Sequence, residues 1–115
     1  MRSPAQRAGD EAESQALRYL LERGLVPVAR NVSSKFGEID LIMREGEEIV
    51  FVEVRARSRS DFGGAAGSVG AAKQSRLRRE AQRWLGHRYG DCWPACRFDV
   101  CAIERGEIDW IRGAF

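Results

Sequence analysis

Apolar residues follow two different periods along this chain of 115 residues. Over residues 4–23 and 69–88 they recur every three to four positions, which predicts two helices with one buried face each. Elsewhere they gather in short stretches rich in β-branched residues, which predict strands at residues 25–32, 37–44, 49–57, 97–103 and 107–111. The order α-β-β-β-α-β-β predicts an α/β fold, with a mixed central sheet flanked by helices.

The first helix has a clear start and a distinctive inner face. Ser3 can cap it, Pro4 suits its first position, and Gly24 can end it. At 100° per residue one face carries a narrow stripe of mainly small residues, Ala5, Gly9, Ala12, Ala16 and Leu20. This stripe predicts close packing on a sheet. Glu13 lies at its edge and is the acid that we expect to reach inward.

Residues 37–57 predict a β-hairpin whose acidic side chains gather on one face. The alternation assigns one face to the apolar residues Ile39, Leu41, Met43, Val50, Val52, Val54 and Ala56. It assigns the other face to Glu38, Asp40, Ile42, Phe51, Glu53, Arg55 and Arg57. The acids are therefore not scattered among the apolar residues.

The register of this hairpin decides how closely two acids approach. We expect a four-residue turn at residues 45–48 to set Asp40 opposite Glu53 and Glu38 opposite Arg55, and a two-residue turn to make Asp40 and Glu53 diagonal neighbours. Either way their Cβ atoms lie roughly 5–8 Å apart. Two such carboxylates repel unless a cation lies between them or one is protonated. Their oxygen atoms suit Mg²⁺ or Mn²⁺.

The second helix combines an apolar face with a basic flank. We expect its inward face to contain Leu77, Ala81, Trp84, Leu85 and Arg88. Lys73 lies near the edge of that face, and Arg76, Arg79 and Arg83 flank it. Taken alone, this pattern favours a core helix with a solvated basic side over a nucleic-acid surface. The preceding residues 58–70 predict a mobile Gly/Ser-rich loop, which lacks the Gly-x4-Gly-Lys-Ser/Thr pattern of a phosphate loop.

Length and composition limit the remaining choices. A chain of 115 residues with 43% hydrophobic and 31% charged residues predicts a single folded domain over residues 1–115. The net charge of +2 decides nothing, but basic residues cluster at Arg55, Arg57 and Arg59 and again from Lys73 to Arg88, which hints at a polyanionic partner.

Cysteine usage and the lack of targeting signals predict a cytoplasmic protein. There is no signal-peptide core at the N-terminus and no run of 18 apolar residues, so we expect no membrane contact. Three cysteines, Cys92, Cys96 and Cys101, fit a reducing compartment. Together with His87 they lack the usual ligand spacing of a zinc site, and we expect no zinc.

The set formed by Asp40, then Glu53-Val54-Arg55, with Glu13 and Lys73 on the helices, resembles the PD-(D/E)XK nuclease superfamily. A closer resemblance, to the YraN family of small bacterial proteins usually placed in that superfamily, covers nearly the whole chain. The matching pieces are Gly9 with Glu13 and Ala16, Arg30-Asn31, GEIDLI (37–42), FVEV (51–54) with Arg57, Lys73, RFDV (97–100) and Ala114-Phe115. The resemblance implies an α-β-β-β-α-β restriction endonuclease-like core.

The resemblance also implies roles for individual residues. Asp40 and Glu53 would be metal-binding carboxylates, with the Val54 carbonyl as a further ligand. Glu13 corresponds to the helix-borne acid of resolvase-like members. Arg55 stands where the superfamily has lysine, and arginine stays charged and cannot act as a base. Lys73, whose counterpart usually contacts substrate, is the lysine that could take over the lost role.

Two further acids have two readings each. Glu38 either binds a second metal ion or pairs with Arg55, and pairing is favoured. Asp99 either forms a structural pair with Arg97 or belongs to a site, and the structural role is favoured.

Two functions follow from this reading. The first is a Mg²⁺- or Mn²⁺-dependent endonuclease that cleaves structured or single-stranded nucleic acid, DNA rather than RNA, and grips flanking phosphates through Arg57, Lys73, Arg76, Arg79 and Arg83. Because several such substrates need two active sites, a homodimer stays open. The second is an inactive or weakly active module of the same fold that binds nucleic acid or a protein partner.

Overall fold

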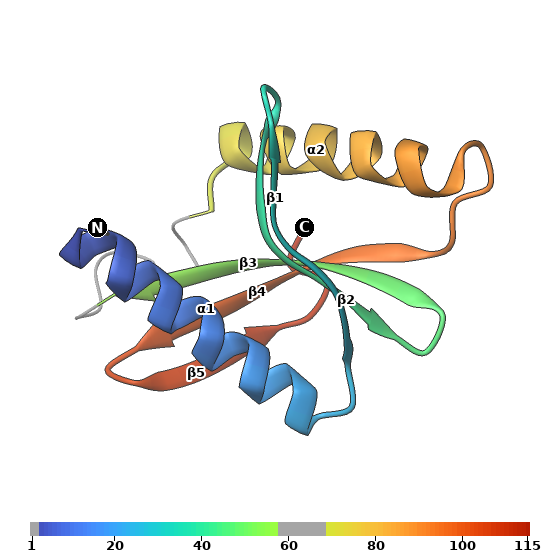
Figure 1. Ribbon diagram of the computed structural model, residues 1–115. Coiled ribbons are helices and arrows are strands. Elements are labelled where there is room, and N and C mark those ends of the chain that lie inside the picture. Colours follow the sequence, from blue (N-terminus) through green and yellow to red (C-terminus); the bar gives the residue numbers. More distant parts are fainter. Residues whose placement is uncertain (1–2, 58–68) are drawn as a thin grey trace.

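The computed structural model describes residues 3–57 and 69–115 (Figure 1). Within these residues the element order is α1 (Pro4–Glu22), β1 (Val26–Ser34), β2 (Gly37–Glu45), β3 (Glu48–Arg57), α2 (Ala71–Tyr89), β4 (Cys96–Glu104) and β5 (Glu107–Ile111). This order confirms the expected α/β class and the α-β-β-β-α-β arrangement. Residues 58–68 of the predicted mobile loop, Arg59 among them, lie outside the described residues.

Helix α1 begins with the cap that the sequence indicates. The Ser3 hydroxyl accepts a hydrogen bond from the Gln6 backbone N–H, and the Gln6 side chain accepts one from the Ser3 N–H. This reciprocal pair satisfies two backbone donors that a helix start leaves free, and Pro4 follows where no donor is needed. The buried residues of the helix are Ala12, Ala16 and Leu20, the C-terminal part of the predicted stripe.

The five strands of the described residues form one sheet in the order β1-β2-β3-β4-β5. Neighbouring strands are antiparallel except β3 and β4, which are parallel because α2 connects them. Figure 1 shows α1 and α2 on opposite sides of this sheet. The sheet therefore has a hydrophobic cluster on each face, and β3 lies at its centre.

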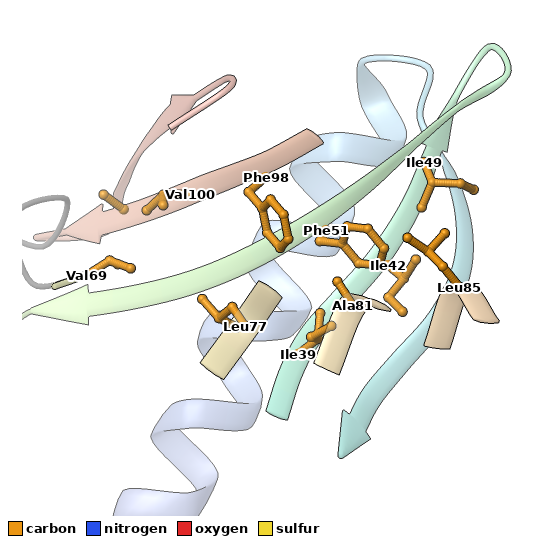
Figure 2. Close-up of a cluster of buried hydrophobic side chains, with 11 residues drawn as sticks. Ile39, Ile42, Ile49, Phe51, Val69, Leu77, Ala81, Leu85, Phe98 and Val100 are labelled. Carbon is orange, nitrogen blue, oxygen red and sulfur yellow. The ribbon is translucent and has the colours of Figure 1, made fainter. Parts of the chain in front are cut away.

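The cluster beneath α2 contains Phe51 and Phe98, stacked with ring centroids 5.2 Å apart, against Leu77, Ala81 and Leu85 of the helix (Figure 2). The cluster beneath α1 joins Ala16 and Leu20 to the strand residues Leu41, Met43, Val50, Val52 and Cys101. Each helix thus buries its apolar stripe against the alternate side chains of β2 and β3. Neither helix of the described chain is long and apolar enough to cross a membrane.

Strand β2 departs from simple alternation at Asp40. We expected Ile39 on the same face as Leu41 and Met43, and this is wrong: Ile39 packs with Ile42 in the cluster beneath α2 (Figure 2). The strand changes partner here, because its pairing with β3 starts at Leu41 while its pairing with β1 continues to Gly37. Asp40 therefore sits where β2 turns away from β3.

The β2–β3 turn has the shorter of the two expected lengths, but its register is the one that we expected of the longer turn. Glu45 pairs with Glu48, so the turn contains two residues, of which Gly46 has a φ of 60°. We expected a two-residue turn to make Asp40 and Glu53 diagonal, which is wrong. The pairing of Leu41 with Val52, continued by one residue, sets Asp40 against Glu53. The same register results from a turn of four residues, since both lengths share one centre.

Helix α2 confirms Leu77, Ala81 and Leu85 on the inner face, but Arg88 is exposed and its predicted burial is wrong. The charged residue that α2 buries is instead Glu80, which is fully buried. The Glu80 carboxylate accepts hydrogen bonds from the Ser34 hydroxyl of β1 and from the Arg83 guanidinium. This contact fastens the end of the β1–β2 hairpin to α2.

Candidate active site

The two predicted metal-binding acids meet where β2 and β3 separate. Beyond the Leu41–Val52 pair, the Val54 backbone N–H donates to Asp40 Oδ2 at 2.9 Å instead of to a strand carbonyl. The bond fixes the Asp40 carboxylate over β3, close to the neighbouring Glu53. The change in the direction of β2 thus places an acid where a regular strand would place another backbone pair.

Glu53 is the most constrained group of the site. It is 4% exposed, and its Oε2 atom lacks a hydrogen-bond partner among the described residues. Burial, followed by the hydrogen bond and the negative charge of Asp40, raises the pKa of Glu53 to about 8, although Lys73 and Arg55 act in the opposite direction. A buried carboxyl group with a raised pKa beside a second carboxylate is an arrangement that a bound cation would stabilise.

Two basic side chains accompany this pair. Lys73, in the first turn of α2, places Nζ 3.5 Å from Glu53 Oε2, and its side chain is 34% exposed. Arg55, two residues along β3, is half-buried, and its positive charge also lowers the pKa of Glu53. The chain therefore surrounds the acid pair with positive charge from a strand and a helix.

Glu13 reaches inward from α1, as expected. Its side chain is 13% exposed, and burial, then the negative charge of Asp40, raises its pKa against the opposing effect of Arg30. Arg30 Nε of β1 lies 3.5 Å from Glu13 Oε1, and its Nη2 donates to the Ser14 hydroxyl at 3.0 Å. We did not predict this positioning role of Arg30; the Arg30-Asn31 pair in the family motif was its one signal.

One cavity of about 450 Å³ brings together the residues predicted to bind the metal ion or to act in catalysis. Its lining includes all six of them: Glu13, Asp40, Glu53, Val54, Arg55 and Lys73. Beside Glu13, the wall from α1 contains the small residues Ala5, Ala8, Gly9 and Ala12, which leave space over the acids. A second cavity of about 460 Å³ shares Gly9 and Glu13 and contains Glu38. Its lining also includes Asn31 and Ser33 of β1, and Ser33 pairs with Glu38 in the β1–β2 ladder.

The donor set can be compared with what a divalent cation requires. Within residues 3–57 and 69–115, no three His, Cys, Asp or Glu side chains lie close enough together to hold a metal ion. Asp40 and Glu53 offer two carboxylates, and Val54 lines the same cavity. Mg²⁺ commonly binds through one or two carboxylates and keeps several waters. The free Oε2 atom of Glu53 fits this requirement.

The predicted phosphate-binding residues differ in their surroundings. Arg76 and Arg79 are exposed on α2. Arg83 is 29% exposed, and its guanidinium is bound to Glu80. The side chain of Arg57 lies outside the described part of the structure. Arg76 and Arg79 are thus the arginines of this set whose positive charge faces solvent.

Asp99 has the structural role that we favoured. It is fully buried, and it accepts hydrogen bonds from the Arg97 guanidinium at 3.0 and 3.1 Å, the Trp110 indole N–H at 2.9 Å and the Gly113 backbone N–H at 2.9 Å. These donors connect β4, β5 and the C-terminal residues. Four donors satisfy both oxygens of this carboxylate, which explains why it can remain buried.

The cysteines do not line the cavity around Glu53. Cys92 and Cys96 are exposed after α2 and at the start of β4, whereas Cys101 is buried beneath α1. All three are free thiols, and burial raises the pKa of Cys101 to about 12. Their positions therefore separate them from the candidate active site.

The fold and the cavity define an α/β protein in which buried Glu53 and half-buried Asp40 lie together, beside Arg55 and Lys73, at the point where β2 and β3 separate. Residues 12–103 match the uncharacterised protein family UPF0102. The chain belongs to this family, which is the YraN family that its motifs indicated.

Individual relatives agree with this assignment. A UPF0102 protein of Bordetella parapertussis is 52% identical over 98% of this chain, which spans 66% of that relative. A UPF0102 protein of Methylobacillus flagellatus is 49% identical over 93% of this chain and 95% of its own length. One from Ralstonia pickettii is 53% identical over 93% of the chain and 88% of its own length.

Proposed function

We propose that this protein is a metal-dependent phosphodiesterase that cleaves nucleic acid at the cavity around Asp40 and Glu53. The observation that carries the proposal is the state of Glu53, buried to 4% exposure against a second carboxylate with one oxygen free of hydrogen bonds. Such an arrangement destabilises the fold unless a bound cation offsets the buried negative charge. A cation beside a phosphodiester is the ligand that two acids and nearby basic side chains suit best.

Each residue of the cavity has a distinct role in this mechanism. Asp40, oriented by the Val54 N–H, and Glu53 would hold Mg²⁺ or Mn²⁺, with the Val54 carbonyl as a further ligand. The bound ion would polarise the scissile phosphate and lower the pKa of a water molecule. Arg55 and Lys73 would offset the charge that develops on the phosphoryl oxygens. Arg55 remains charged and takes no proton.

The surface beside the cavity favours a substrate held by its backbone. Arg76 and Arg79 are exposed on the helix that also carries Lys73, so phosphates flanking the cleaved bond would meet positive charge. Contacts of this kind depend strongly on salt and select little for sequence. We therefore propose structured or single-stranded DNA as the substrate.

A non-catalytic nucleic-acid-binding role is the second candidate, and one contact favours it. The Lys73–Glu53 ion pair at 3.5 Å already offsets part of the charge of the acid pair without a metal ion. Arg55 in place of a lysine is consistent with weak or absent cleavage.

Cleavage of labelled duplex, single-stranded, flap and four-way-junction DNA in Mg²⁺ and in Mn²⁺ tests the proposal. The variants are Asp40→Ala and Glu53→Ala, and Glu47→Ala in the exposed β2–β3 turn is the matched control. We expect cleavage by the wild type and by the control, and a loss of at least 100-fold in both site variants. Salt-sensitive binding without cleavage, unchanged in the site variants, would instead support the binding module.

A further inference from the structure

We infer that Lys73 is an internal counter-ion that occupies the acid pair until a divalent cation binds, and that it is then released toward the substrate phosphate. The inference rests on the proposed metal site and adds to it a competition between a side chain and the ion. It concerns what Lys73 does before substrate arrives.

Lys73 forms an ion pair with Glu53. Its Nζ lies 3.5 Å from Glu53 Oε2, the buried oxygen that lacks a hydrogen bond among the described residues. A well-formed ammonium–carboxylate hydrogen bond is nearer 2.8 Å. The contact is therefore an ion pair without close hydrogen bonding, of the kind that a better-placed cation can replace.

Lys73 lies in the first turn of its helix. Lys73 is the third residue of α2, whose first turn contains no acid and whose N-cap residue, Gly70, provides no side-chain hydrogen bond. A cation here faces the positive end of the helix dipole, which disfavours its charge. Since the helix itself disfavours this charge, the acid pair across the cavity is what holds it in place.

The Lys73 side chain has space in which to move. Lys73 lines the cavity of about 450 Å³ and keeps 34% of its side chain exposed, whereas Glu53 is fixed in the sheet. A flexible four-carbon stem lets the ammonium leave Glu53 without any change in the backbone. The released charge stays in the same cavity, where a phosphate would bind.

This exchange makes a prediction about metal affinity. Lys73 and a divalent cation compete for the same carboxylate, so removing Lys73 should tighten Mn²⁺ binding even if it impairs cleavage. Even after it leaves Glu53, the Lys73 ammonium stays in the cavity and repels the bound Mn²⁺, which lowers the affinity of the wild type further. If Lys73 were merely structural, its removal would leave Mn²⁺ binding unchanged or weaken it.

Calorimetric titration of Mn²⁺ into Lys73→Met tests the competition. The chain has only two lysines, and Lys35, exposed at the β1–β2 turn, provides the matched control Lys35→Met. We expect a three- to tenfold lower Kd for Lys73→Met and a Kd within twofold of wild type for Lys35→Met. An unchanged or higher Kd for Lys73→Met would overturn the inference and leave the metal site standing. If wild type bound no Mn²⁺ at all, the proposed function would fail, and the inference with it.

Acylation of the two lysines in one sample gives an independent readout on the unmodified chain. A limiting amount of an amine-reactive ester is added with and without saturating Mn²⁺, and mass spectrometry measures the ratio of modified Lys73 to modified Lys35. We expect the ratio to rise at least threefold with Mn²⁺ as Lys73 leaves Glu53, and to stay constant in Asp40→Ala. A ratio that Mn²⁺ does not change in the wild type would contradict the release of Lys73.

Discussion

The backbone N–H of Val54 donates a hydrogen bond to Asp40 Oδ2 at 2.9 Å, and this one bond joins the two strands at the point where their ladder ends. It replaces a strand-to-strand bond with a strand-to-carboxylate bond, which holds Asp40 beside Glu53. The sheet itself therefore holds the two acids together. The free energy of unfolding measures how much this proximity destabilises the protein.

Glu53→Gln should stabilise the protein at pH 8 in the absence of divalent ions. The raised pKa of about 8 means that folded Glu53 keeps its proton while the unfolded chain loses it above about pH 4.5. The stability of the wild type therefore falls as pH rises from 4.5 to 8. We expect the variant to gain roughly 1–3 kcal/mol at pH 8 and less at pH 5.

Urea unfolding of both proteins in EDTA at pH 5, 6.5 and 8 measures this difference. Mn²⁺ should reverse the order at pH 8, because it stabilises only a protein that binds it. A difference between the two proteins that does not vary with pH would show that Glu53 is ionised in the folded state.

Arg76→Ala and Arg79→Ala should each weaken DNA binding several-fold and reduce its salt dependence by about one counterion. Both side chains are exposed on α2, so neither substitution leaves a buried partner. Fluorescence anisotropy with a labelled oligonucleotide at several salt concentrations measures both quantities. Equal affinity and an equal salt slope in the variants would remove α2 from the proposed interface.

Arg83→Ala should act on stability instead. Its guanidinium is bound to the fully buried Glu80, so the substitution leaves a buried carboxylate that keeps the hydrogen bond from the Ser34 hydroxyl but loses its positive partner. We expect a loss of about 2–4 kcal/mol in urea unfolding. A loss below 0.5 kcal/mol, together with weaker DNA binding, would assign Arg83 to the interface.

Asp99→Ala should cost about 2–4 kcal/mol of stability, because it leaves the Trp110 indole N–H and the Gly113 backbone N–H without their acceptor. The Arg97 guanidinium would keep only its contacts with Glu45 and Glu48. Exposed Asp109 of β5 provides the control, Asp109→Ala, which should change stability by less than about 0.5 kcal/mol. Chemical unfolding measures both. Calorimetry on folded Asp99→Ala should give the wild-type Mn²⁺ affinity, and a lost site would mean that Asp99 also supports the metal centre.

Two glycines should respond in opposite directions to alanine. Gly9→Ala should stabilise the protein by roughly 0.5–1 kcal/mol, since Gly9 lies within α1 and an added Cβ meets no atom within 4 Å. Gly37→Ala should destabilise it by about 1 kcal/mol, because the new Cβ would lie 3.2 Å from the Arg76 carbonyl oxygen. Thermal unfolding of the pair distinguishes them, and the same sign for both would contradict the close approach of β2 to α2.

The sequence predicted those features that depend on short stretches of chain. The helix start at Ser3, the hairpin of β2 and β3 and the pairing of Asp40 with Glu53 each follow from residues close in sequence. Ile39 was misplaced because alternation assumes that a strand keeps its direction. The turn of β2 at Asp40 comes from its partners on either side, which local alternation does not include.

The long-range polar contacts of Glu80 and Arg30 could not be predicted for a related reason. Glu80 finds its partner Ser34 at a separation of 46 residues, and Arg30 meets Glu13 only when β1 passes α1. A charge on a helix is usually solvated, so its burial follows from tertiary packing alone. Lys73 was expected near the acids only through the family resemblance.

The irregular first strand has a consequence for self-association. β1 forms one edge of the sheet, and it contains Pro27, which has no N–H to donate, beside a register shift between Pro27 and Ala29. The opposite edge is the five-residue strand β5. Both edges are poor templates for another strand, which protects the sheet from edge-to-edge aggregation. A homodimer of this chain would therefore be expected to assemble through its helices or its cavity face.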